Sequence, residues 1–172
     1  AVDLNLVHPL TGPVHIEAPM PVIFATGEPD AVPLWPAEQS RPALPQPSRE
    51  QIEQAADLLA RAEHPLVVSG SGVDRANANA AVLSLVELLD CPVVTTMAGR
   101  GTLPRDHPSF IYGFGHGGDV VRKEADVIVV VGSRLGNLEL PYDKYWGPSS
   151  RHPIIQIDVD PRHIAVTRPL TV

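Results

Sequence analysis

The chain has 172 residues, of which 44% are hydrophobic and 19% are charged, the balance of a globular protein with one sizeable core. Its net charge of -7 argues against nucleic acid and anionic membranes as partners, because neutralising phosphates requires clustered lysine and arginine. Cys91 is the single cysteine, which excludes an internal disulfide and a cysteine-rich zinc site. With no long apolar run and no signal peptide pattern, the chain is expected to be cytoplasmic and to have no membrane span.

Proline content divides the chain into three predicted segments. Residues 1–28 contain a strand-like run at 14–18 that has no hairpin partner nearby. Six prolines lie between Pro29 and Pro47, so residues 29–47 are predicted to be an extended, semi-rigid linker. Residues 48–172 are predicted to form one α/β domain. Because the chain starts without methionine and ends on an apolar run, we expect a piece of a longer protein, truncated at its C-terminus.

Helical and strand patterns alternate along residues 48–172. Ser48 opens a helix, with Gln51 completing a capping box. The patterns that follow predict a buried strand from 65, a helix at about 74–90, a strand at 91–96, a short helix near 119–124, and strands entered at 126 and 153. Such alternation implies right-handed crossovers. The predicted fold is therefore a doubly wound, mostly parallel α/β sheet with helices on both faces, a Rossmann-like nucleotide-binding variant.

The ends of two predicted strands carry candidate ligand residues. The strand entered at 126 is a run of β-branched residues without polar alternation, typical of a strand buried on both faces of a parallel sheet. It ends in Gly132, Ser133 and Arg134, and the last strand ends in Asp158 and Asp160. Parallel sheets bind ligands beyond the carboxyl ends of their strands, so both groups fall where ligands sit.

A glycine turn follows the strand from 65. Gly70, Ser71 and Gly72 stand between a strand and a helix, where backbone N–H groups can approach an anion. Arg75 stands at the position of the third glycine of the dinucleotide fingerprint. Both a tight structural turn and a ligand contact are consistent with this pattern.

A second glycine group, Gly113, Gly115, Gly117 and Gly118, surrounds His116. Each glycine adds to the entropy lost on folding, so four glycines together are expected to serve a purpose. Close approach of the backbone to a flat or anionic ligand would be such a purpose. The alternative is a mobile surface loop, with His116 facing solvent.

The polar strand ends also allow two interpretations each. Arg134 either clamps a phosphate or stacks on a ring, or it forms a surface salt bridge. Asp158 and Asp160 suit ribose hydroxyls or an adenine amine, or they cap the helix begun by Pro161. No motif for a phosphate loop lysine, a zinc protease or a serine hydrolase is present, so no catalytic or metal-binding residue is assigned.

The order of these motifs resembles the central domain of thiamine-diphosphate-dependent enzymes, most closely the acetolactate synthase-like group. The resemblance covers about residues 41–170. It is carried by the glycine turn at 70–72, by Thr95-Thr96-x-x-Gly99-x-Gly101-x-x-Pro104-x-x-His107-Pro108, by the glycine cluster, by 125–134, and by Ile155-Gln156-Ile157-Asp158-Val159-Asp160. Upstream, residues 12–19 are similar to the last strand of the preceding pyrimidine-binding domain.

The resemblance implies a three-domain parent subunit in which thiamine diphosphate and Mg²⁺ lie between the pyrimidine- and diphosphate-binding domains of two subunits of a dimer or tetramer. The central domain of such enzymes holds FAD, ADP or nothing, and this chain alone is expected to be inactive. A nucleotide in this domain would contact Gly70, Ser71, Gly72, Thr96, Gly115, His116, Gly117, Gly118, Gly132, Ser133, Arg134 and Asp158.

One segment departs from the family pattern. FAD-holding acetolactate synthases carry Arg-Phe-Asp-Asp-Arg after the strand-end glycine, whereas Arg134 is followed here by Leu135-Gly136-Asn137-Leu138. A decarboxylase or carboligase of another substrate is therefore as consistent with the sequence as an acetolactate synthase. Two other classes are alternatives: an FAD- or NAD-binding module of flavoprotein type, and an NAD-dependent deacylase, against which the single cysteine argues.

Overall fold

The computed structural model describes residues 15, 17–28, 36, 44–136 and 152–172. The chain divides into two units, residues 1–46 and 47–172. In the first unit the helix α2 (Met20–Ile23) forms a single turn. Of the run at 14–18, for which the sequence predicts a strand, the described residues His15, Glu17 and Ala18 have no regular secondary structure. A strand is stable only beside a partner, and the run has no hairpin partner nearby in the sequence.

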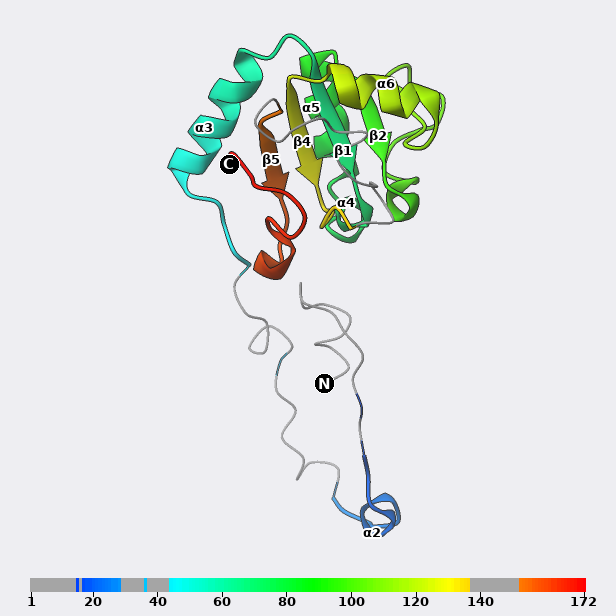
Figure 1. Ribbon diagram of the computed structural model, residues 1–172. Coiled ribbons are helices and arrows are strands. Elements are labelled where there is room, and N and C mark those ends of the chain that lie inside the picture. Colours follow the sequence, from blue (N-terminus) through cyan, green and yellow to red (C-terminus); the bar gives the residue numbers. More distant parts are fainter. Residues whose placement is uncertain (1–14, 16, 29–35, 37–43, 137–151) are drawn as a thin grey trace. The chain divides into compact units, whose positions relative to one another are not determined.

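Five parallel strands form the sheet of the second unit, in the order β3-β2-β1-β4-β5 (Figure 1). They are β1 (Pro65–Ser69), β2 (Val93–Thr95), β3 (Phe110–Ile111), β4 (Val127–Val131) and β5 (Ile154–Ile157). The register aligns Val67 of β1 with Val93 on one side and Val129 on the other. From β1 the chain winds outward to β3 and then returns to the other side of β1 as β4. The predicted doubly wound α/β fold is confirmed.

Helices cover both faces of this sheet. They are α3 (Arg49–Ala60), α4 (Ser71–Arg75), α5 (Asn79–Leu89) and α6 (His116–Glu124), with the 3-10 turns η3 (Met97–Gly99) and η4 (Pro161–His163). Alternate strand residues point to opposite faces. Val67, Val93, Val129 and Ile155 pack with Val73, Val82 and Val86 of α4 and α5. Leu66, Val68, Ile128 and Val130 pack on the other face, toward Val121 of α6.

The predicted start of α3 is confirmed in atomic detail. The backbone N–H of Gln51 donates to Ser48 Oγ at 3.1 Å, and the backbone N–H of Ser48 donates to Gln51 Oε1 at 2.9 Å. Both bonds satisfy N–H groups at the helix start that have no partner within the helix. The capping box therefore fixes where α3 begins.

Two predicted helix boundaries are wrong. The single helix at about 74–90 is two helices, because the chain turns between α4 and α5 through Asn77, whose φ is 51°. Asparagine tolerates this left-handed conformation better than most residues, so it can interrupt an otherwise apolar helical pattern. The helix expected near 119 begins at His116, inside the glycine cluster.

Candidate nucleotide-binding edge

The loops that follow β1 and β4 touch through their backbones. Beyond β1, the N–H of Gly70 donates to the Val131 carbonyl at 2.8 Å, and the N–H of Gly72 donates to the Gly132 carbonyl at 3.0 Å. Beyond β4, the N–H of Gly132 donates to the Ile157 carbonyl at 2.8 Å. These bonds extend the parallel ladder past the strands, so the carboxyl ends of β1, β4 and β5 form one continuous edge.

Glycine is required at three positions of this contact. A Cβ on Gly70 would lie 2.3 Å from the Gly132 carbonyl oxygen, and a Cβ on Gly72 would lie 2.6 Å from Gly132 Cα. Gly132 itself has φ +63°, in the left-handed region. The close approach of the two loops thus explains why glycine is needed in this turn, as the structural interpretation predicts. Ligand contact by Gly70, Ser71 and Gly72 stays a prediction.

Ser133 and Arg134 follow directly on the β4 side. Ser133 is buried, and its Oγ accepts from the backbone N–H of Leu135 at 3.1 Å, closing a tight turn in which Leu135 has φ 54°. Arg134 is exposed. No hydrogen bond or ion pair holds its guanidinium within the part of the chain that the structure describes. The turn therefore presents an exposed guanidinium at the edge where β4 ends.

Thr96 follows β2 and caps the 3-10 turn η3. Its side chain is buried and its Oγ1 accepts from the backbone N–H of Gly99 at 3.1 Å, which starts η3. A Cβ on Gly99 would lie 2.4 Å from the Ser69 carbonyl oxygen, so η3 also packs tightly against the end of β1. The contact of Thr96 with a nucleotide stays a prediction.

The glycine cluster is split between a loop and a helix. Gly115 has φ +97° and is exposed, as are His116 and Gly117, whereas Gly118 is buried in the first turn of α6. A Cβ on Gly118 would lie 2.8 Å from the Tyr112 carbonyl oxygen. Gly118 is therefore needed for close packing, whereas Gly115, His116 and Gly117 are exposed to solvent in the segment after β3.

A buried arginine that sequence reading missed anchors this loop. Arg122 of α6 is 3% exposed, and its Nη1 donates to the Gly113 carbonyl at 2.6 Å while Nη2 donates to Asp119 Oδ1 at 2.5 Å. In the sequence it is one polar residue of an amphipathic helix, which gives no sign that it turns inward. It holds the end of β3 onto α6.

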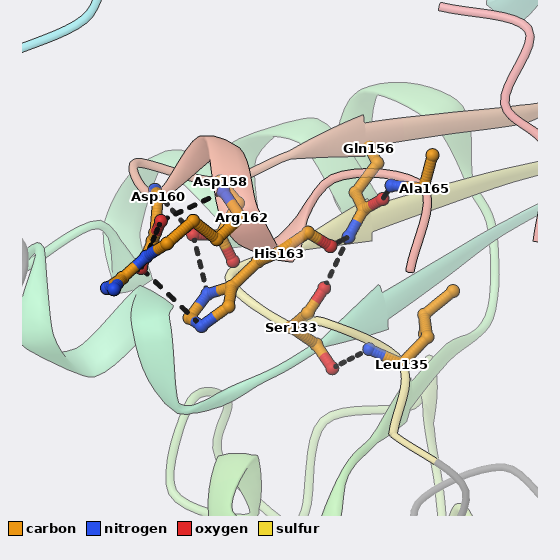
Figure 2. Close-up of polar contacts among 8 residues, drawn as sticks. All are labelled: Ser133, Leu135, Gln156, Asp158, Asp160, Arg162, His163 and Ala165. Carbon is orange, nitrogen blue, oxygen red and sulfur yellow. Dashed lines mark hydrogen bonds and ion pairs between the residues drawn. The ribbon is translucent and has the colours of Figure 1, made fainter. Parts of the chain in front are cut away.

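Asp158 and Asp160 are tied into a cluster beyond β5 (Figure 2). Asp158 Oδ1 accepts from the backbone N–H of Asp160 at 2.9 Å and lies 3.2 Å from His163 Nδ1. Asp160 Oδ1 accepts from the backbone N–H of Arg162 at 2.9 Å, so the predicted capping role of Asp160 is confirmed for the 3-10 turn η4. The hydrogen bonds from the Arg162 guanidinium are the main cause that lowers the pKa of Asp160 to about 2.

A second residue that sequence reading missed, Gln156, links the loops after β4 and β5. Its Nε2 donates to the carbonyls of Ser133 and His163, each at 2.9 Å, and its Oε1 accepts from the backbone N–H of Ala165 at 3.0 Å. A polar residue inside an apolar strand was the available signal, because such a residue needs partners when it is half-buried.

The opposite edge of the sheet carries a cavity of about 370 Å³. Its lining residues are His64, Lys123, Glu124, Ala125, Asp126 and His152. Asp126 binds the backbone N–H groups of Glu63 and His64 there, at 2.7 and 3.0 Å. These residues lie at the amino ends of β1 and β4, so the cavity is separate from all the predicted ligand residues.

The described residues bring together no group of three His, Cys, Asp or Glu side chains that could hold a metal ion. The carboxyl edge carries the exposed guanidinium of Arg134, backbone groups and the carboxylate of Asp158. Among the helices that the structure describes, none is long and apolar enough to cross a membrane.

Comparison with known proteins matches residues 52–172 to the family model "Thiamine pyrophosphate enzyme, central domain". The chain is 33% identical over 160 residues to a Methanocaldococcus jannaschii protein named "Probable acetolactate synthase large subunit", covering 89% of this chain and 27% of that protein. It is 32% identical over 159 residues to the glyoxylate carboligase of Escherichia coli O157:H7, covering 89% of this chain and 26% of that protein.

A solved structure from Mycobacterium smegmatis, described as a thiamin diphosphate-dependent enzyme, agrees in fold. It matches with a TM-score of 0.60 and 30% sequence identity, over 72% of this chain and 24% of that chain. The chain thus spans about a quarter of the length of the relatives that it matches. On the family model and these relatives, the chain belongs to the central-domain family of thiamine-diphosphate-dependent enzymes.

Proposed function

We propose that this chain is the central domain of a thiamine-diphosphate-dependent 2-oxo acid decarboxylase or carboligase, and that it holds FAD or ADP at the carboxyl edge of β1, β4 and β5. The observation that carries the proposal is the sheet order. It reverses between β1 and β4, and in doubly wound sheets nucleotides bind at such a switch point.

The chemistry at that edge supports a nucleotide. Arg134 carries an exposed guanidinium, which can pair with a diphosphate through two parallel hydrogen bonds. Asp158, the residue directly after Ile157 of β5, can accept a ribose hydroxyl through Oδ2, since Oδ1 already has two partners. Gly115, His116 and Gly117 are exposed at the end of β3 for further contacts.

In this proposal the domain has no catalytic group of its own. Thiamine diphosphate and Mg²⁺ would be held by the pyrimidine- and diphosphate-binding domains of a parent homo-oligomer, a dimer or tetramer. Residues 1–28 would end the pyrimidine-binding domain, and 29–47 would be the linker. Four apolar residues past or at the end of β5 are exposed, as expected of a face that meets another domain: Ile157 at 53%, Val159 at 37%, Ile164 at 36% and Val166 at 57%.

The substrate that we propose for the parent enzyme is a 2-oxo acid. The relatives include proteins named as an acetolactate synthase subunit and as a glyoxylate carboligase, and the segment after Arg134 does not carry the Arg-Phe-Asp-Asp-Arg pattern. With Cys91 as its only cysteine, the chain has the composition of a protein of the reducing cytoplasm, where we place the parent.

Calorimetric titration of the chain with FAD and, separately, with ADP tests the nucleotide site. Saturable binding of either ligand is expected. Arg134→Ala should weaken it about tenfold or more, because a charge-assisted hydrogen bond contributes about 1.5 to 3 kcal/mol. Arg61→Ala removes the same charge from the residue after α3, near the amino end of β1, and should leave the affinity unchanged.

Absence of heat with either ligand, from a chain shown by circular dichroism to be folded, would contradict nucleotide binding and leave a purely structural domain. Equal loss of affinity in the Arg134 and Arg61 variants would instead indicate a general effect of charge, and would remove Arg134 from the site.

A further inference from the structure

The side chain of Gln156 bonds to two loops of the carboxyl edge through both of its N–H donors and its carbonyl oxygen. A primary amide has two N–H donors and a carbonyl oxygen that accepts up to two hydrogen bonds. In Gln156 the donors reach the carbonyls of Ser133 and His163 at 2.9 Å each, and the acceptor receives the Ala165 N–H at 3.0 Å (Figure 2). One side chain therefore joins the loop after β4 to the loop after β5.

Each of these loops carries one of the proposed nucleotide contacts. Ser133 directly precedes Arg134, and its Oγ fixes the turn through the Leu135 N–H. On the other side, the ring of His163 lies against Asp158 Oδ1 at 3.2 Å. Gln156 thus binds the carbonyl of Ser133, the residue before Arg134. It also binds the carbonyl of His163, whose ring contacts Asp158.

The loops need such a link because their conformations are not favoured by themselves. Leu135 has φ 54° and Ala165 has φ 57°, and non-glycine residues in this region cost about 1 kcal/mol or more each unless the surroundings hold them. The amide of Gln156 bonds to both loops and so ties the backbones of Ser133 and His163 together.

We propose that Gln156 is a positioning residue for the nucleotide, which sets the spacing between the guanidinium of Arg134 and the carboxylate of Asp158. The inference rests on the proposed function and deepens it. A nucleotide contacts both groups at once only if they stand at a fixed separation, and holding them there before binding removes an ordering cost from the association. Gln156 itself touches no ligand.

Gln156→Met tests this role, because methionine keeps the length of the side chain and adds no charge but forms none of the three hydrogen bonds. The affinity for ADP, measured by calorimetry, should fall about tenfold or more, since about 1 kcal/mol is expected from each lost bond. Gln54→Met, the same substitution on the exposed face of α3, should leave the affinity unchanged.

A variant that only loses stability separates positioning from folding. Ile155→Val shortens a core residue next to Gln156 that is 3% exposed, and should lower the melting temperature without changing the ADP affinity of the folded chain. Titrations are made at a temperature where circular dichroism shows each variant folded. The exchange rate of the Ala165 N–H, followed by NMR, should rise in Gln156→Met and not in Ile155→Val.

The outcomes are distinct. Native affinity in Gln156→Met, in a chain that binds ADP, would overturn the positioning role and leave the nucleotide site intact. Equal weakening in Gln156→Met and Ile155→Val would assign the effect to stability and would overturn it too. If the native chain binds neither ADP nor FAD, the proposed function fails and this inference fails with it.

Discussion

The loop after β4 is joined to its two neighbours in two different ways. On the β1 side, the contact is backbone against backbone, with Gly70 and Gly72 lying directly on Gly132. On the β5 side, one backbone hydrogen bond joins Gly132 to Ile157, and beyond it the Gln156 side chain bonds the carbonyls of Ser133 and His163 (Figure 2). The β4 loop therefore lies directly on the glycines of the β1 loop, whereas a polar side chain links it to the loop after β5.

The two contacts restrict the residues of the loops to different degrees. A backbone contact leaves no room for a side chain, so it fixes the β1 and β4 loops rigidly and restricts its residues to glycine. A contact made by a side chain, such as that of Gln156, places no such restriction on the residues of the loops that it joins.

Replacing Gly132 by alanine should break the backbone contact and give the largest effect. The new Cβ would lie 2.7 Å from both Gly72 Cα and the Val73 nitrogen, at a residue with φ +63°. The left-handed conformation costs about 1 to 2 kcal/mol and overpacking adds about 1 to 3 kcal/mol, so a loss of about 3 kcal/mol or more is expected. Urea unfolding measures this loss directly.

Gly101→Ala is the matched control for that variant. Gly101 is exposed, and the nearest atom to its Cβ position, Asp74 Oδ2, is 3.8 Å away. The free energy of unfolding should therefore change by less than about 0.5 kcal/mol. If Gly132→Ala were as stable as Gly101→Ala, the two loops would have to be able to move apart, and the edge would not be rigid on the β1 side.

Much of the fold was predictable because its signals are local. The apolar run of β4 and the capping box at Ser48 and Gln51 each act through residues close in sequence, and both predictions are confirmed. The break at Asn77 was missed because a positive φ in one residue leaves the apolar spacing of the surrounding helix pattern almost intact.

The candidate site was less accessible to sequence reading. Gly70, Gly72 and Gly132 were found because glycines stand out in the sequence. The reason for them was not visible, because the loops that touch are about 60 residues apart in the chain. Gln156 and Arg122 were not found, since one amide in a strand and one cation in a helix are each compatible with solvent exposure. Only the fold shows which backbone groups they meet.

A second pair of variants compares side-chain contacts below the same edge. Ser69 Oγ donates to Thr102 Oγ1 at 2.8 Å, and Thr102 Oγ1 donates to the Gly99 carbonyl at 2.8 Å, with both side chains buried. Thr102→Val keeps the shape but leaves the Ser69 hydroxyl without its acceptor. A loss of about 1 to 3 kcal/mol is expected in urea unfolding.

Thr95→Val is the control, with the same chemical change beside Ser69 in the register. Thr95 Oγ1 is buried and has no hydrogen-bond partner within the described residues. Removing it should leave the stability unchanged or raise it by about 1 kcal/mol. Equal losses in Thr95→Val and Thr102→Val would show that side-chain shape, and not the hydroxyl chain, links the ends of β1 and β2.

The smallest expected effect is a pH dependence on the β5 side. The pKa of Asp160 falls from 3.8 to about 2, chiefly through hydrogen bonds from Arg162, which in turn raise the pKa of Arg162. A lowered carboxyl pKa stabilises the fold above about pH 4, and this contribution disappears as the pH falls toward 2. Arg162→Ala should therefore melt a little lower than the native chain at pH 5, and the two melting temperatures should converge near pH 2.

The exposed pair of Arg49 and Glu53 separates this effect from the loss of any arginine. Its side chains are 92% and 61% exposed, so Arg49→Ala should shift the melting temperature little at any pH. A gap between Arg162→Ala and the native chain that stays constant from pH 5 to pH 2 would mean that Arg162 acts through packing. The turn after β5 would then be held by packing, as the β1 side is by its glycines, and not by the ion pair of Asp160 and Arg162.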